Sequence, residues 1–348
     1  MNNLNEKYFF SKIPIKSYFI FFVFLLLLLI LGIASVFPFL SERKFRDAFH
    51  FSIYKRHKFV IEDMKQAIDY SPWESHYMIS LGRDYQNYYF SLNNEDQQLK
   101  VLKELEKLYK QVLFYDKYNP WVYLYLSNVY MLFKKHYPDQ GSFYDLRVDD
   151  SYKKMVEIGF LNPLFVLNYA IYQHKTKNNL KEAKVFYERV ISYDKSMGDA
   201  YFGLSNIYAV NQEYKKATGI LEDLYKVNPR YRGLVITLSN IYLQQRNYDQ
   251  CEQILLAENN IQPNQENILQ YLVKLYYSQE KFDQAVTYLD ELYQFFPKQE
   301  PKMFYCYIDS LHKSKRYSQA YSLLLGYLLK YPNDKFADQW LKKIKKNL

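Results

Sequence analysis

The hydrophobic and polar positions of this chain repeat in a fixed pattern over its C-terminal half. The segment Leu204–Tyr208 reads Leu-Ser-Asn-Ile-Tyr, and the same five residues return at Leu238–Tyr242, 34 residues later. Within one such step, apolar residues recur at helical spacing on either side of a polar break at Asn211–Glu213. The pattern therefore predicts a unit made of one helix, a tight turn and a second helix.

Three further columns of residues keep nearly the same step. An aromatic residue stands at the start of each second helix, a small residue follows, and a proline ends the helix. These columns are Tyr214, Tyr248, Phe282 and Tyr317; Ala217, Cys251, Ala285 and Ala320; and Pro229, Pro263, Pro297 and Pro332. Because one helix pair cannot bury both of its faces alone, neighbouring pairs are expected to stack.

This unit resembles the tetratricopeptide repeat (TPR), which carries a Leu-Gly-x-x-Tyr element, an alanine in its second helix and a closing proline. The best-preserved first element is Leu81–Tyr85, which reads Leu-Gly-Arg-Asp-Tyr. The resemblance implies an all-α fold: a right-handed α-solenoid of about eight TPR-like helix pairs over residues 41–335, and a basic capping helix at 336–348. The pairs are expected to begin near Ser41, Ser75, Pro120, Leu164, Gly198, Arg232, Glu266 and Pro301.

Two of the predicted units are longer than the others. The first insertion, Ser91–Lys100, lengthens the approach to a strongly periodic helix. The second, His136–Tyr144, contains a proline and a glycine and reads as a loop. Insertions in solenoids can serve binding or can simply be longer connections, and both readings stay open here.

An apolar segment precedes the repeats. Residues 18–40 carry no charge, and a helix of 23 residues is long enough to cross a bilayer core of about 30 Å. We therefore expect a single transmembrane helix that acts as a signal-anchor, after a short basic tail at residues 1–17. A cleaved signal peptide is the alternative, since lysines precede the segment and the small residues Ala34 and Ser35 lie near its end.

The sequence gives two conflicting signals about the side of the membrane. The basic residues are Lys7, Lys12 and Lys16 before the segment, and Arg43, Lys44, Arg46, Lys55, Arg56 and Lys58 after it. This excess would keep the repeats in the cytoplasm by the positive-inside rule, but long domains translocate largely regardless of charge. A short lysine-bearing tail before an apolar run is also typical of an export signal. We favour a periplasmic domain anchored in the inner (cytoplasmic) membrane, and the scarcity of cysteine agrees with it.

Composition removes several classes of function. The 9 glycines and 11 prolines among 348 residues argue against an all-β chain and against Gly-rich nucleotide-binding loops. Two cysteines cannot form a four-thiolate zinc site, and the six histidines include no i, i+4 pair. Cys251 falls in the small-residue column of its second helix and Cys306 lies on an apolar stripe, so we interpret both as core packing. No P-loop or Gly-x-Ser-x-Gly motif is present, so we predict no catalytic residue, no metal, no cofactor and no enzyme activity.

The positive charge is concentrated at the C-terminal end. Residues 298–348 hold 11 Lys and Arg against 4 Asp and Glu, although the whole chain carries only +9. The last helix ends in a basic patch of Lys342, Lys343, Lys345 and Lys346. This patch could meet anionic lipid or an acidic partner, or it could be a solvated face matched to the helix dipole. Nucleic acid is not expected, because no interleaved basic and aromatic motif accompanies the patch.

The TPR resemblance also implies a binding groove. First helices line the concave surface in this family, and the residue after the Gly-like position commonly faces a bound peptide. That column reads Arg83, Asn128, Tyr172, Asn206, Asn240, Lys274 and Asp309. Asparagine both donates and accepts, which suits the backbone of an extended segment, although it also tolerates any half-exposed helical position. A chaperone-type carboxylate clamp is not expected, because Phe202 and Ile236 occupy the positions where it needs a basic residue.

These features together predict a membrane-anchored TPR scaffold that binds a protein partner in its concave groove and supports assembly of an envelope complex. Single-anchor proteins of the family resemble assembly factors of secretion, polysaccharide and flagellar-motor complexes. A composition rich in Lys, Asn, Tyr, Phe and Leu favours a bacterial source. The alternative is an accessory protein of envelope glycan biosynthesis, in which exposed tyrosines would stack on the sugar rings of a polysaccharide.

Overall fold

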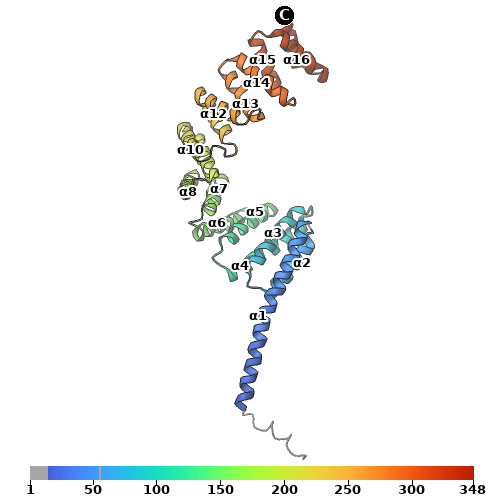
Figure 1. Ribbon diagram of the computed structural model, residues 1–348, viewed down its shortest axis with the longest axis vertical. Helices are drawn as coiled ribbons and strands as arrows, with labels where there is room; N and C mark the ends of the chain where they lie inside the picture. The colour runs from blue at the N-terminus through green and yellow to red at the C-terminus, as the bar shows by residue number, and fades with distance from the viewer. Residues whose placement is uncertain (1–14, 55) are drawn as a thin grey trace, which may run out of the picture. The chain divides into compact units, whose positions relative to one another are not determined.

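The computed structural model describes residues 15–54 and 56–348, and over these residues its regular structure is entirely helical (Figure 1). Most of the basic tail expected at residues 1–17 lies outside the described residues. The described chain divides into two compact units, one ending at Phe160 and the other running from Leu161 to Leu348. Each unit is described by itself below.

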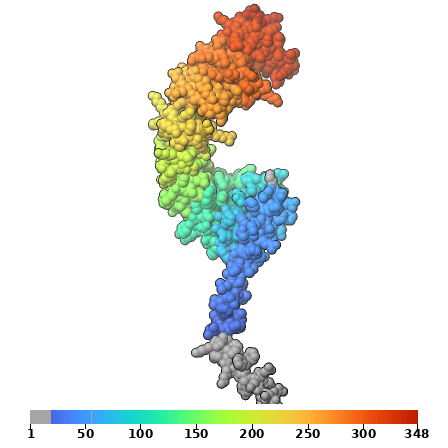
Figure 2. Space-filling view, in the orientation of Figure 1, coloured from blue at the N-terminus to red at the C-terminus, as the bar shows by residue number. Residues whose placement is uncertain are grey.

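Helix α1 (Ile15–Ile53) contains the apolar segment and also the first helix of the first pair. All side chains from Phe19 to Phe39 are exposed, whereas Ser41 and Ala48 are fully buried against the first unit. Among the described residues, α1 is the one helix long and apolar enough to cross a membrane. Figure 2 shows it leaving the first unit as an isolated rod.

The first unit continues with antiparallel helices, and α1 packs on α2, α3 on α4 and α5 on α6. Their bounds are α2 (His57–Tyr70), α3 (Ser75–Ser91), α4 (Glu95–Tyr115), α5 (Pro120–His136), a short 3₁₀ helix η1 (Pro138–Gln140) and α6 (Gly141–Ile158).

The second unit repeats the same plan with more uniform lengths. Its paired helices are α7 (Pro163–Lys175) with α8 (Leu180–Tyr193), α9 (Gly198–Val210) with α10 (Tyr214–Val227), α11 (Leu234–Gln244) with α12 (Tyr248–Ile261), α13 (Glu266–Ser278) with α14 (Phe282–Phe295), and α15 (Pro301–Lys313) with α16 (Tyr317–Lys330). Helix α17 (Lys335–Lys345) follows these pairs and packs on α16. The α-solenoid of about eight TPR-like helix pairs that the sequence predicted is confirmed, since eight pairs precede α17 in the described residues.

Small residues let the two helices of a pair approach closely. The Ser205 hydroxyl on α9 donates to the backbone carbonyl of Ala217 on α10 over 3.0 Å, and both residues are buried. One pair later, the Cys251 thiol takes the place of the alanine and lies 3.6 Å from the carbonyl of Ser239. Burial raises the pKa of the Cys251 thiol to about 11, so this cysteine is a packing residue and not a thiolate at neutral pH.

Neighbouring pairs are joined by hydrogen bonds from tyrosine to carboxylate. Tyr242 on α11 donates to Glu222 on α10 over 2.6 Å, and Tyr276 on α13 donates to Glu252 on α12 over 2.7 Å. In the first unit, Tyr130 on α5 donates to a carboxylate on α4 in the same manner. These tyrosine rings are buried while their hydroxyls find partners, so these tyrosines serve to pack neighbouring pairs together.

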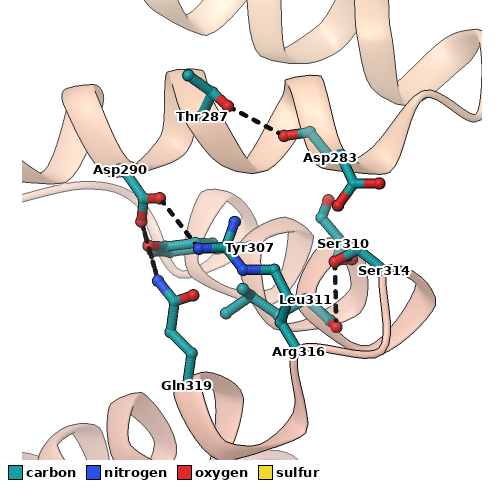
Figure 3. Close-up of polar contacts among 9 residues, drawn as sticks. All are labelled: Asp283, Thr287, Asp290, Tyr307, Ser310, Leu311, Ser314, Arg316 and Gln319. Atoms are coloured by element: carbon teal, nitrogen blue, oxygen red, sulfur yellow. Dashed lines mark hydrogen bonds and ion pairs between the residues drawn. The ribbon is translucent and has the colours of Figure 1, made fainter.

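One of these contacts joins three helices (Figure 3). The Asp290 carboxylate on α14 accepts from Tyr307 on α15, and it also accepts from the Gln319 amide on α16 over 3.1 Å. The Arg316 guanidinium lies 3.8 Å from the other carboxylate oxygen. Asp290 therefore connects consecutive pairs at a single point.

The loop predicted at His136–Tyr144 is wrong. Helix α5 continues to His136, and α6 already begins at Gly141 after one turn of 3₁₀ helix. The ring of Phe133 stacks on that of Tyr144 with centroids 5.5 Å apart, and Tyr137 stacks on the same two rings. Aromatic packing across the connection therefore keeps the segment helical.

Candidate functional site

A cavity of about 680 Å³ lies within the second unit, and side chains of α7, α8, α9 and α11 line it. The helices α7, α9 and α11 are first helices of consecutive pairs, and the sequence predicted a groove along first helices. We call this cavity the groove cavity. Its polar lining includes His174, Asp199, Asn206, Thr237, Asn240 and Gln244.

The floor of the groove cavity depends on a glycine. The Tyr187 ring comes from α8, is 1% exposed, and occupies the space beside Gly203 on α9. A Cβ atom at position 203 would lie 2.3 Å from this ring, so only glycine lets α9 approach. The Tyr187 hydroxyl is hydrogen-bonded to Nδ1 of His174 on α7 over 3.2 Å, which ties three helices together.

The floor is electrically neutral near pH 7. Burial raises the pKa of Tyr187 to about 12. Burial also lowers the pKa of His174, and a hydrogen bond with the Asn206 side chain offsets part of this lowering. The two remaining charges on the lining have opposite signs, because Lys175 and Asp199 both line the cavity. The site therefore offers neutral donors and acceptors in place of a field of one sign.

Two residues of the predicted groove column lie in this cavity. Asn206 on α9 is exposed, and Asn240 on α11 is half-buried. The Asn240 side-chain oxygen accepts from the exposed Lys274 on α13 over 3.4 Å, so the predicted positions on three consecutive first helices lie in a row.

Tyr172 does not face the groove, and its expected place in the column is corrected to Ile171. Tyr172 is 3% exposed and packs in the core, whereas Ile171 lines the cavity. The column was counted in steps of 34, but the turn between α7 and α8 has four residues where the turns of the later pairs have three. The extra residue moves every position of α7 by one.

The remaining predicted positions do not line the groove cavity. Arg83 on α3 is exposed and Asn128 on α5 is half-buried, and both belong to the first unit. Asp309 on α15 accepts from the Tyr277 hydroxyl over 2.5 Å and pairs with Lys313 over 3.0 Å. Its carboxylate therefore already has partners within the solenoid.

Several lining residues were not predicted from the sequence. Thr237 and Gln244 lie three and four positions from Asn240 on the same face of α11, and following the helical period would have found them. His174 carried no such signal, because its place beside Tyr187 depends on the register of α7.

The basic patch predicted on the last helix is exposed at Lys342, Lys343, Lys345 and Lys346. Lys342 pairs with Asp338 over 3.2 Å, and the Lys343 ammonium lies 4.3 Å from the centre of the Trp340 ring. Two of the four charges are thus held against their own helix. Within residues 15–54 and 56–348, no group of three or more His, Cys, Asp or Glu side chains could hold a metal ion.

Comparison with known proteins gives similarity to solved structures only. No protein-family model and no curated protein matches the chain. A TPR protein from Parabacteroides merdae is 16% identical, with a TM-score of 0.45, over 78% of this chain and 98% of its own. YrrB, described as a TPR protein with an unusual peptide-binding site, is 18% identical, with a TM-score of 0.44, over 55% of this chain and 97% of its own. PilF of Pseudomonas aeruginosa is 14% identical, with a TM-score of 0.42, over 66% of this chain and 97% of its own.

The helix pairs of the chain define its class directly. Each pair of the second unit has the TPR order of a first helix, a short turn and a second helix with a small residue near its start. The fold that this resemblance implied, an α-solenoid of TPR-like helix pairs, is therefore confirmed.

Proposed function

We propose that this protein is a membrane-anchored TPR scaffold that binds an extended segment of a protein partner in the groove cavity. The observation that carries the proposal is the row of Asn206, Asn240 and Lys274 beside a neutral floor. An extended peptide exposes alternating backbone donors and acceptors, and asparagine amides can pair with both. A TPR-type fold of stacked helix pairs provides such extended binding surfaces.

The charges of the cavity favour protein over nucleic acid. A nucleic-acid site neutralises several phosphates with lysine and arginine, whereas this lining holds Asp199 as well as Lys175. The glycan alternative has less support, because many tyrosines that could stack on sugars are used for packing. Tyr242, Tyr276 and Tyr307 are buried and donate to carboxylates of neighbouring helices.

We further propose that α1 crosses the inner membrane of a bacterium and places both units in the periplasm. The exposed apolar side chains from Phe19 to Phe39 support the membrane span, because they would otherwise face water. A reporter that is active on only one side of the membrane, fused after Leu348, tests the orientation. Activity in the cytoplasm would reject the periplasmic placement and move the search to cytoplasmic partners.

Co-purification from the native membrane tests the groove. The double substitution Asn206→Ala and Asn240→Ala should reduce recovery of the partner, while Asn228→Ala, an exposed asparagine that does not line the groove cavity, should leave it unchanged. Equal recovery from all three chains, with unchanged helix content by circular dichroism, would remove the groove as the binding site. The identity of the recovered proteins would show whether a secretion, polysaccharide or flagellar-motor complex is involved.

A further inference from the structure

The first unit has aromatic side chains at the end where α1 enters it. We propose that this end lies on the lipid surface, with Trp73, Phe114, Tyr118 and Trp121 in the headgroup region. We call these four residues the interfacial aromatic group. The inference rests on the proposed membrane span of α1 and adds a second, peripheral contact between the scaffold and the bilayer.

The first step is the level of the loop between α2 and α3. The ring of Tyr70, the last residue of α2, stacks on that of Phe37 in α1 with centroids 6.0 Å apart. Close by, the Ser41 hydroxyl donates to the carbonyl of Ala67 over 2.7 Å. The end of α2 thus lies beside the last turn of the apolar segment, which ends at Leu40.

The start of α3 lies at nearly the same level. Tyr77, the third residue of α3, donates to Glu42 of α1 over 3.2 Å, and its ring lies 5.0 Å from that of Phe45. The loop at residues 71–74 is therefore level with the end of the membrane segment. Trp73 on this loop is 58% exposed.

The level of the loop between α4 and α5 follows from the packing of α4 on α3. The Tyr109 ring of α4 packs directly on Gly82 of α3, where a Cβ atom would lie 2.4 Å from its hydroxyl. Gly82 lies seven residues after Ser75, and Asp116 lies seven residues after Tyr109, about 10 Å in each case. Because α3 and α4 run antiparallel, the end of α4 is level with the start of α3.

The side chains on this second loop suit a bilayer interface. Phe114 is 82% exposed, Tyr118 is 68% exposed, and the Lys117 ammonium lies 4.8 Å from the centre of the Tyr118 ring. Trp121, in the first turn of α5, is 39% exposed. Tryptophan and tyrosine are enriched at membrane interfaces, where one part of the ring system is buried in lipid and a polar group stays hydrated. Lysine reaches from such sites towards the headgroups.

Fluorescence quenching in the full chain tests the contact, since the chain has only three tryptophans. Variants that keep only Trp73 or only Trp121 are made by Trp→Phe substitution and reconstituted in nanodiscs of plain or brominated lipid. We expect brominated lipid to reduce the emission of both tryptophans.

A matched pair of variants controls for exposure. In a chain with all three tryptophans replaced by phenylalanine, Phe114→Trp should be quenched and Phe90→Trp should not. Phe90 is also highly exposed, at 71%, but it lies at the opposite end of α3, about 22 Å from Ser75 along the helix.

The outcomes separate this inference from the proposed function. If the chain does not float with lipid vesicles, the anchor itself is wrong and both proposals fail. If the chain floats but Trp73 and Phe114→Trp are quenched no more than Phe90→Trp, only the interfacial contact is overturned. Unchanged helix content of each variant by circular dichroism shows that the result does not come from unfolding.

Discussion

The two units connect the helices of a pair in different ways. In the second unit, every turn within a pair holds one non-glycine residue in the left-handed conformation, with φ between 53° and 61°. These residues are Asn178, Gln212, Arg246, Glu280 and Lys315. Among the described residues of the first unit, none has positive φ. There, α3 and α4 are joined through extended residues up to Asn94, and α5 and α6 through a 3₁₀ helix.

The regular turn has consequences for the whole unit. The second helices α8, α10, α12, α14 and α16 are all 14 residues long, whereas α2, α4 and α6 have 14, 21 and 18 residues. A constant turn returns the chain in a constant direction, so the same interhelical contacts recur. Where the turns differ, each pair packs through contacts of its own, such as that between the Tyr109 ring and Gly82.

The largest expected effects come from core truncation in each unit. Leu105 on α4 and Leu221 on α10 are both fully buried. Leu→Ala at either position should cost about 2–5 kcal/mol of stability, and the loss should fall mainly on its own unit, because each helix pair contacts only its neighbours. Hydrogen exchange by mass spectrometry should show faster exchange in α3 and α4 for Leu105→Ala and in α9 and α10 for Leu221→Ala. An equal increase in hydrogen exchange in both units would contradict the division of the chain into two units.

The next largest effects on stability should come from substitutions of glycines at close contacts. Gly82→Ala and Gly203→Ala place a methyl group against the rings of Tyr109 and Tyr187, and overpacking of this kind costs about 1–3 kcal/mol. A Cβ atom added to Gly326 on α16 would meet no other atom within 4 Å, so Gly326→Ala should instead gain about 0.5–1 kcal/mol from its helical position. Thermal unfolding of the three variants checks the opposite signs. A stabilised Gly203→Ala chain would show that the Tyr187 ring can move.

A smaller effect is expected from alkaline pH on the second unit. The pKa of Tyr187 is raised to about 12 by burial, while an unfolded tyrosine ionises near pH 10. The stability that protonated Tyr187 contributes to the folded state is therefore complete below about pH 10. It is lost as the pH rises towards 12, because the unfolded chain releases the proton first. Urea unfolding at increasing pH should show this decline, and Tyr187→Phe should make it shallower. An unchanged slope in Tyr187→Phe would mean that other groups cause the alkaline loss.

The smallest effect concerns the turns themselves. Glu280 has φ of 60° and is exposed, so Glu280→Gly should relieve left-handed strain and stabilise the chain by up to about 1 kcal/mol. Leu92, in the turn between α3 and α4, has φ of −89°, and Leu92→Gly should only lose stability. Chemical unfolding of both variants measures the difference. The same sign for both would show that the two kinds of turn are not energetically distinct.

Much of the fold could be predicted from the sequence, because the periodicity is local. Predicted starts at Ser75, Pro120, Gly198, Glu266 and Pro301 coincide with the first residues of helices. The start expected near Arg232 is displaced to Leu234, because Gly233 adopts φ of 82° before the helix begins. The helix pairs could therefore be predicted, but the left-handed conformation of one residue shifted the start of one helix.

Only part of the candidate site could be predicted from the sequence, since its residues come from different helices. Asn206 and Asn240 could be found because they occupy equivalent positions in identical five-residue segments. The contact between His174 and Tyr187 could not be predicted, because it depends on the register of α7 against α8, which the four-residue turn between them sets.

The local pattern of apolar residues was enough to predict that the chain forms stacked helix pairs. The spacing of residues such as Leu204, Tyr208 and Ala217 decides which side of each helix must leave water, and this requires no knowledge of the neighbours. The local pattern could not show that Ile171 and not Tyr172 faces the groove cavity, because this depends on how the helices pack. One extra residue in a turn rotates a helix face by about 100°, and only the packed neighbours show which residue then meets the solvent.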